Sequence, residues 1–551
     1  MPAFAQEGHV LRTPLGFRPH LCAVLAFALL WIACGGFAAP VVLNTNLQLR
    51  LVLHTATAGG AASVRIAKNP RDNQLYYLKI NGDVFKLNLS PGTDSSATRI
   101  ATSANHGLST SVEGLAIGPD GAIYLVANLT TNSGNANIAR IMKGTPTGTG
   151  TLLWSMLAQT EPYPLSRTAF DHLCNGLVVS PDGQFLFLNS GSRTDHGEIE
   201  TTGGLYPNLR DAPLTAKILR LPTSASNLIL TNDLIGLKNA GYVYAEGTRN
   251  AFSLAFGPGG NLFATDNGPD RDMSDELNWI RPGLHYGFPW RMGGADNPQQ
   301  FPSYNPATDL LLDRRFVAVA NGYYQNDPAF PPPPTNFAEP VINLGPDACS
   351  YRDPADGSVK VASQVGQTLI TFTAHRSPLG LVFDVASAMA PPFQQHGFVL
   401  GWTTGDPVGN NVPGPFLDPG QDLLDLNLTQ LGTTNYQAQV TRLVGGFSNP
   451  IDAAIIGNRI YVIEYSGNQG VWEVTFPPAA PIVISQPVWL RSGGFGFNIS
   501  TTPGQTYAID ASTNLSLWSE LTNLSGTNLS IQFRDNAATG SPSRFYRVHS
   551  P

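Results

Sequence analysis

The sequence has few charged residues, few cysteines and no long apolar run. Only 13% of its 551 residues are Asp, Glu, Lys or Arg, against roughly 25% in an average globular protein. The formal net charge of -7 provides no basic surface, so we expect no nucleic-acid partner. No CxxC motif, Cys/His zinc spacing or CxxCH haem motif occurs, which excludes the common cysteine-based cofactor sites.

Only four cysteines are present, and Cys22 and Cys34 fall in the N-terminal stretch. The remaining two, Cys174 and Cys349, could pair in an oxidising compartment. A disulfide requires their Cα atoms to lie within about 7 Å, which the sequence does not determine.

The N-terminus has the pattern of an export signal over residues 1–39. Arg12, Arg18 and His20 precede an apolar run at 21–33, and the small-residue stretch "CGGFAAP" follows. The run is shorter than the ~20 residues that cross a bilayer. We therefore expect a mature chain without a membrane span that is secreted, periplasmic or on the cell surface, with lipid attachment at Cys34 left open.

Glycine and proline, with 56 and 44 residues, are abundant, and one pattern recurs six times. Each copy has a short apolar strand, a turn resembling Pro-Asp-Gly and a second, alternating strand. The copies begin at Val64, Val112, Cys174, Ala251, Pro378 and Pro450. Repeated hairpins of this kind predict an all-β fold with a six-bladed propeller over residues 40–476. A pair of β-sandwiches and a β-solenoid are the alternatives.

Two segments interrupt or follow this repeat. The Pro- and Asn-rich stretch at about residues 291–350 predicts a long surface excursion. After Phe476 the sequence "PPAAP" predicts a stiff joint, and residues 477–551 alternate as in a small immunoglobulin- or fibronectin-like β-sandwich. We expect Trp518, Phe533, Phe545 and Tyr546 to fill the core of this module, which could attach the protein to a cell surface.

The fourth copy runs into a loop with many acidic residues. It contains Asp266, Asn267, Asp270, Asp272, Asp275 and Glu276. Such a loop is either a solvated turn or a site that holds a cation. The spacing is not that of an EF-hand, so the pattern alone leaves both interpretations open.

The stretch "GTRNAFSLAFGPGGNLFATDNGPDRDMSDELNWIRPGLHYGFP", from Gly247, resembles the glucose/sorbosone dehydrogenase family. The similarity extends to "FDHLCNGLVVSPDGQFLFLNSGS" and "FTAHRSPLGLVFD", and in patches covers about residues 60–476. That family includes soluble aldose dehydrogenases that use pyrroloquinoline quinone (PQQ) and calcium on a six-bladed propeller. The resemblance implies a quinoprotein that oxidises an aldose or related sugar to a lactone and passes electrons to an external acceptor.

The resemblance also implies roles for individual residues. It places His172 as the catalytic base and Arg249 beside the reacting oxygen, chemistry that suits a side chain titrating near neutral pH and a permanently charged fork. It assigns the cofactor to Asn250, Asn267, His375 and Arg376. It assigns calcium to the carbonyls of Gly268 and Pro269, because calcium prefers hard oxygen ligands. Structural calcium is assigned to Asp275, Glu276 and Tyr286.

One stretch departs from the family. PQQ carries three carboxylates, and family members often place a basic residue after the fifth blade's second strand, where this chain has "GWTTGDPVGNNVPGP" without Lys or Arg. Arg376, Arg352 or Lys360 could replace it. Asp195 and His196 could lie near His172.

Two further functions stay open. A calcium-dependent sugar lactonase would need side chains that converge from several blades, for which Glu113, Asn175 and Asp266 are candidates. A non-catalytic surface-binding propeller would need neither the base nor the cofactor.

Overall fold

The computed structural model describes residues 39–57, 60–90, 95–148, 150–405, 415–491, 493–502, 506–540 and 543–549. The predicted export signal, with Cys22 and Cys34, therefore lies outside the described residues except for its last position. The described chain is nearly all β. No helix in these ranges is long and apolar enough to cross a membrane.

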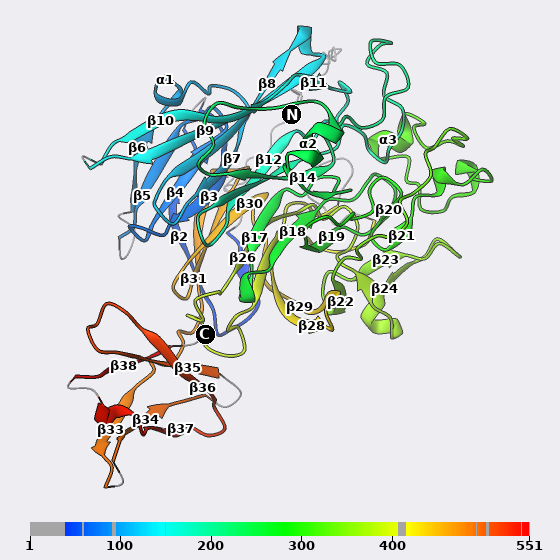
Figure 1. The fold of residues 1–551 in the computed structure, drawn as a ribbon. Helices are drawn as coiled ribbons and strands as arrows, with labels where there is room; N and C mark the ends of the chain where they lie inside the picture. The colour runs from blue at the N-terminus through cyan, green and yellow to red at the C-terminus, as the bar shows by residue number, and fades with distance from the viewer. Residues whose placement is uncertain are drawn as a thin grey trace, which may run out of the picture.

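Six larger sheets, each built on antiparallel strands, lie within residues 48–475 of the described chain (Figure 1). From the innermost strand outward, the first sheet contains β3 (Ser63–Asn69), β4 (Gln74–Lys79), β5 (Val84–Asn88) and β6 (Ser96–Ala101), and the second contains β7 (Val112–Ile117), β8 (Ile123–Thr131), β9 (Ala136–Pro146) and β10 (Leu152–Thr160). The third contains β12 (Cys174–Val179), β13 (Phe185–Ser190), β14 (Lys217–Pro222) and β16 (Val243–Glu246), and the fourth contains β17 (Ser253–Phe256), β18 (Leu262–Asp266) and β19 (Glu276–Ile280). The fifth contains β26 (Pro378–Phe383), β27 (Gly397–Gly401), β28 (Asp422–Leu431) and β29 (Asn435–Gly445), and the sixth contains β30 (Pro450–Ile456), β31 (Arg459–Glu464), β32 (Gly470–Thr475) and β2 (Gln48–His54).

The inner strands form a closed ring. β3 contacts β7, and contacts continue through β12, β17, β26 and β30 back to β3. The sixth sheet takes its outer strand from the N-terminal side, because β2 pairs antiparallel with β32. The predicted six-bladed propeller is confirmed, and each of the six recurrent hairpins supplies the two innermost strands of one blade.

Glycines in the inner strands explain part of the repeated pattern. A Cβ on Gly114 would lie 2.4 Å from the Asn175 carbonyl oxygen, and one on Gly176 would lie 2.8 Å from that of Phe252. A Cβ on Gly380 would lie 2.8 Å from the Asp452 Cα. Only glycine lets neighbouring strands converge this closely at the axis.

The hydrophobic core is divided among the spaces between neighbouring blades. One cluster joins the second and third blades, for example through Tyr124, Ile141 and Leu188, and comparable clusters join the other pairs. Cys174 and Cys349 are both buried and unpaired, so they form no disulfide.

The predicted excursion at 291–350 is only partly a surface feature. It contains the hairpin of β20 (Arg291–Met292) and β21 (Ala295–Asp296), the short helix α3 (Val317–Ala320) and β22 (Ile342–Pro346), which joins the fifth sheet. The Tyr324 side chain is buried and donates a hydrogen bond of 2.9 Å to Asp195 in the third blade. The segment therefore covers one face of the propeller.

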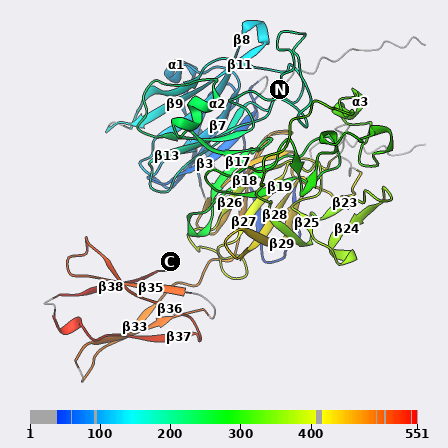
Figure 2. The same cartoon turned by 45° about the vertical axis from the view of Figure 1, so that its right-hand side comes forward.

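After β32 the chain forms two three-stranded antiparallel sheets, seen in orange and red in Figure 2. One contains β33 (Ile484–Trp489), β34 (Phe495–Ser500) and β37 (Ser530–Asp535), and the other β35 (Thr506–Ser512), β36 (Ser519–Ser525) and β38 (Phe545–His549). They share a cluster around Phe497, Ile509 and Phe533. The assignment to an immunoglobulin- or fibronectin-like class stays a prediction.

The expected core of these sheets is correct only in part. Phe533 is buried and Tyr546 packs against the cluster, but Phe545 is 39% exposed. Side chains alternate across β38, so Phe545 faces the side opposite to Tyr546. Trp518 lies outside the cluster, with the Arg547 guanidinium 4.6 Å from its ring centroid.

Candidate active site

A cavity of about 270 Å³ opens at the face of the propeller where inner strands begin. Its walls are the loops before β12, β17 and β26, the loop after β18, the loop after β27, and the residue before α3. The lining residues are Ala169, Phe170, His172, Arg249, Asn267, Gly268, Asp270, Asp275, Phe316, His375, Ser377, Thr403 and Gly405. Six of the predicted site residues thus come together: His172, Arg249, Asn267, Gly268, Asp275 and His375.

His172 reaches the cavity from the loop that precedes β12. Its Nδ1 lies 3.2 Å from the Ser192 carbonyl oxygen. A carbonyl can only accept, so Nδ1 carries the proton and Nε2 keeps its lone pair. Burial, and then the positive charge of Arg249, lower the pKa of His172 to about 3. The imidazole is therefore neutral at physiological pH with its Nε2 lone pair available, but its pKa lies well below the near-neutral value expected from the sequence, which makes it a weaker base.

Arg249 reaches the cavity from the loop before β17, and its side chain is held by three hydrogen bonds. Nε donates to the Asp195 carbonyl at 2.7 Å, Nη2 to its carboxylate at 2.9 Å, and Nη1 to the Asn267 carbonyl at 3.1 Å. A guanidinium has five N–H donors, so two remain for an oxygen in the cavity.

Asp195 fixes this arrangement. Besides pairing with Arg249, it accepts hydrogen bonds from His196 Nδ1 at 2.8 Å, from the Tyr324 hydroxyl at 2.9 Å and from the Asp270 backbone at 3.0 Å. Burial alone would raise the pKa of Asp195, but the His196 hydrogen bond and the Arg249 charge hold it well below its usual value. Asp195 thus positions Arg249, a role that the sequence did not reveal.

The acidic loop is braced from within. Asp266 accepts from the backbone N–H groups of Arg249 at 2.9 Å and Asn250 at 2.5 Å. Asp275 accepts from those of Gly268 at 2.6 Å and Ser377 at 2.9 Å. Asp266 holds the loop before β17 of its own blade, and Asp275 joins this loop to the one before β26 of the next blade; both carboxylates are buried, so the loop is not a solvated turn.

Three oxygens of this loop are left for a ligand. The Asn267 Oδ1 atom is buried without a hydrogen-bond partner. Within the described ranges, no donor reaches the carbonyl oxygens of Gly268 and Pro269. Asp270 adds charge: burial, and then the charge of Asp195, raise its pKa to about 6. These are hard oxygen donors, as a calcium ion requires.

The structure does not bring Glu276 and Tyr286 together with Asp275 as a metal site. Glu276 lies away from the cavity and accepts hydrogen bonds from the Gly293 backbone and the Asn278 side chain, and burial raises its pKa well above the usual value. The Tyr286 ring packs in the core between two blades. Among the described residues, no group of three or more His, Cys, Asp or Glu side chains could hold a metal ion.

Arg376 does not line the cavity. Its guanidinium is fully buried in the fifth blade, where it pairs with Asp418 and Asp422. Of the neighbours His375 and Arg376, only His375 lines the cavity; both His375 and Ser377 have positive φ, so this segment is a turn and not an extended strand. Asn250 also lies outside the lining, with its Oδ1 accepting from Asn175 at 3.0 Å.

The other two residues that could replace the absent Lys or Arg, Arg352 and Lys360, already form ion pairs. Arg352 pairs with Asp272 at 2.6 Å and Lys360 with Asp353 at 2.5 Å, and neither lines the cavity. His375 donates to the other oxygen of Asp272 at 2.8 Å. Burial by itself would lower the pKa of His375, but this hydrogen bond to Asp272 raises the pKa above its usual value. Around the described part of the cavity, each cation already has an acidic partner.

Three comparisons show which known proteins the chain resembles. Residues 88–308 match the family model for Glucose / Sorbosone dehydrogenase. Quinoprotein glucose dehydrogenase B from Acinetobacter calcoaceticus is 27% identical in an alignment of 217 residues that covers 34% of this chain and 42% of the relative. The chain thus matches about two-fifths of the length of that curated relative.

Solved structures that resemble the chain include two aldose sugar dehydrogenases. The PQQ-bound enzyme from Streptomyces coelicolor is 16% identical, with a TM-score of 0.43 over 79% of this chain and 99% of that one. The soluble apo enzyme from Escherichia coli is 14% identical, with a TM-score of 0.47 over 78% and 99%. The family match over residues 88–308 confirms the similarity of this chain to the glucose/sorbosone dehydrogenase family.

Proposed function

We propose that this chain is an exported sugar dehydrogenase that oxidises an aldose or related sugar to its lactone, with PQQ and calcium bound in the cavity around His172. The observation that carries the proposal is the convergence of a neutral imidazole, a fixed guanidinium and unpaired oxygens on one cavity. The family match supports the reaction class.

The described residues fit the metal and a planar ring. The carbonyls of Gly268 and Pro269 and the orphaned Oδ1 of Asn267 would hold the ion; of these residues Gly268 and Asn267 line the cavity and Pro269 does not. Phe170 and Phe316 supply aromatic walls. Positive charge limits the binding of PQQ in this cavity, because the charge of Arg249 is already paired with Asp195. A divalent ion must therefore supply most of the charge that balances a tricarboxylate.

PQQ, when bound, supplies the acceptor for the hydride, with calcium polarising its carbonyl. His172 acts as the base, and its Nε2 takes the proton of the sugar's anomeric hydroxyl. The Ser192 carbonyl accepts from Nδ1–H and so fixes the orientation of the ring. This hydrogen bond strengthens when the imidazole becomes charged, because Nδ1–H is then a stronger donor. The two free N–H groups of Arg249 bind the oxygen on which charge develops.

Purified protein with PQQ and calcium should reduce a dye when an aldose is added. His172→Gln should lower turnover about 100- to 10,000-fold, the usual contribution of a general base. His549→Gln, on the exposed edge of the C-terminal sheets, is the matched control and should retain full activity. Equal activity of wild type and His172→Gln would refute the assigned role.

The lactonase alternative is less well supported. Its candidates do not form a shared ligand set in the described chain: Asp266 is fully buried and braces two backbone amides, and the Asn175 side chain bonds to other asparagines. Lactone hydrolysis without PQQ would nevertheless favour it. A surface-binding propeller would be indicated if isothermal titration detects no PQQ binding at micromolar concentration with calcium present.

A further inference from the structure

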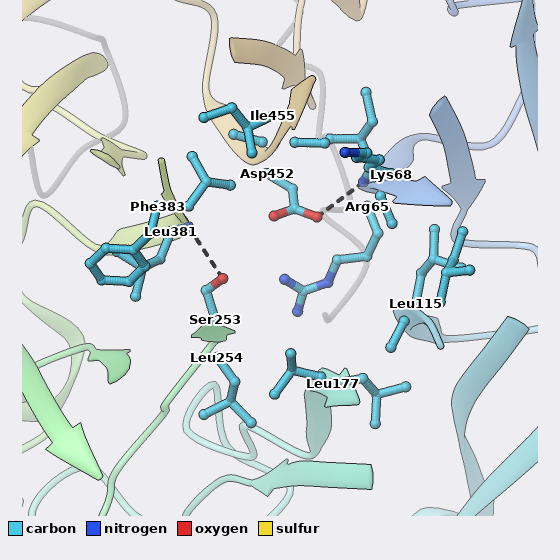
Figure 3. Close-up of a pocket in the computed structure, with 18 of the residues that line it drawn as sticks. Arg65, Lys68, Leu115, Leu177, Ser253, Leu254, Leu381, Phe383, Asp452 and Ile455 are labelled. Carbon is cyan, nitrogen blue, oxygen red and sulfur yellow. Dashed lines mark hydrogen bonds between the residues drawn. The ribbon is translucent and has the colours of Figure 1, made fainter. Parts of the chain in front are cut away.

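A second, separate cavity of about 320 Å³ lies on the propeller axis. All six inner strands contribute to its wall (Figure 3). β12, β17 and β26 begin at the candidate active site and run into this cavity with their later residues, such as Leu177, Leu254 and Leu381. The two cavities therefore lie toward opposite ends of the same strands.

Arg65 lies in this second cavity with part of its guanidinium unused. Nε donates to the Glu113 carbonyl at 2.8 Å and Nη2 to the Phe252 carbonyl at 3.1 Å, and the guanidinium carbon lies 3.8 Å from the centroid of the Phe252 ring. These contacts fix a side chain that is only 4% exposed. They leave Nη1 for a ligand.

Asp452 projects into the same space from the neighbouring strand β30 (Figure 3). One carboxylate oxygen accepts from the Ile66 backbone at 3.0 Å. Arg65 and Asp452 both lie in the described chain, and they make no direct ion pair with each other. Burial raises the pKa of Asp452 to about 6, which means that the carboxylate lacks full compensation.

The remainder of the wall is largely apolar. Leu115, Leu177, Leu254 and Leu381 surround the two charged groups, and the Ser253 hydroxyl lies among them (Figure 3). The lining also includes Lys68 and Asp384, so its formal charges cancel. A site with a few fixed polar groups in an apolar wall, and a volume near the lower end of the usual ~300–1,000 Å³, has the character of a small-molecule site.

We propose that this cavity binds a small neutral molecule with an amide-like head group and a short apolar body. The head group's oxygen accepts from Nη1 of Arg65, and its N–H donates to Asp452. An anionic head group would meet the Asp452 carboxylate, and a cationic one would meet Arg65, so a neutral group with one acceptor and one donor satisfies both residues. The apolar body contacts the four leucines.

The first test is a series of ligands with one ring and different head groups. Benzamide, benzoate, benzamidine and toluene are titrated into the full-length protein and followed by ligand-observed NMR. We expect benzamide to bind at least about tenfold more tightly than the other three, because each of them loses one charge-assisted hydrogen bond or gains a repulsion. Equal affinities for all four, or no benzamide binding at millimolar concentration, would overturn the proposal.

The second test locates the binding. Leu177→Trp should fill the cavity and abolish benzamide binding, and the volume-conserving Leu177→Met should keep it. Asp452→Asn keeps an acceptor for Ile66 and should lower the preference for benzamide over benzoate at least about tenfold. Unchanged benzamide binding in a folded Leu177→Trp protein would place the ligand elsewhere and refute the site.

Discussion

Acidification from pH 8 to pH 5 should destabilise the third blade through His172. In an unfolded chain a histidine takes up a proton near pH 6.5. In the folded protein, burial and the charge of Arg249 lower the pKa of His172 to about 3, although the Ser192 carbonyl partly offsets them. The unfolded state thus binds more protons between these pH values, and stability falls as the pH drops from 6.5 toward 3.

The size of the effect follows from the two pKa values. For a fully shielded group, proton linkage gives about 2 kcal/mol less stability at pH 5 than at pH 8. His172 is partly exposed to the cavity, and solvent screening reduces this to about 1 kcal/mol. His172→Gln cannot take up this proton, so the variant should lose less stability on acidification by that amount.

Amide hydrogen exchange in β12 at increasing urea concentration measures the free energy of unfolding of this blade separately from the C-terminal sheets. It is recorded at pH 8 and pH 5 for wild type, His172→Gln and the His549→Gln control. His285, whose pKa burial lowers to about 4, contributes equally to all three and cancels. The same pH dependence in wild type and His172→Gln would show that His172 titrates normally, and the described environment of the base would be wrong.

Three further changes test other parts of the structure. Asp270→Asn removes an uncompensated carboxylate from the cavity, and titration calorimetry without calcium should show roughly tenfold tighter PQQ binding; weaker binding would contradict the charge argument. Arg376→Met leaves the buried Asp418 and Asp422 with Arg442 as their remaining cationic partner and should cost about 3 kcal/mol in thermal unfolding, the lower end for a broken buried pair; a neutral result would show that Arg376 does not stabilise the blade. Gly176→Ala should cost about 1–3 kcal/mol because its Cβ would meet the neighbouring strand, whereas Gly445→Ala, with open space around it, is the control.

The sequence predicted the architecture because each blade carries its own local signal. The apolar strand, the turn and the alternating strand recur in order, and glycines such as Gly114 and Gly176 mark where strands converge. The outer strands were harder to predict, since β2 comes from the opposite end of the propeller sequence and pairs with β32 only through long-range closure.

The site was predictable through the family resemblance and not from position in the repeat, because Asn250 and Arg376 also precede inner strands but do not line the cavity. His172 and Arg249 precede inner strands, and both reach the cavity. The partners of buried charges were not predictable, because ion pairs such as Arg376 with Asp418 depend on side-chain direction and on distances across the blade. For the same reason the sequence suggested that Asp195 could lie near His172 but did not identify it as the partner that fixes Arg249.

The charge around the candidate active site makes the two expected ligands depend on each other. Arg249 is neutralised by Asp195, and Asp270 and Asp275 add negative charge to the lining. The loop after β27, residues 402–415, contains no Lys or Arg to offset it. A tricarboxylate entering alone would meet net repulsion, whereas one entering with calcium would not. Binding free energies are reciprocal, so PQQ must tighten calcium binding by the same factor by which calcium tightens PQQ binding. If calorimetry finds PQQ affinity independent of calcium, the cavity has a source of positive charge other than the ion, and the proposed assignment of the metal to the carbonyls of Gly268 and Pro269 fails.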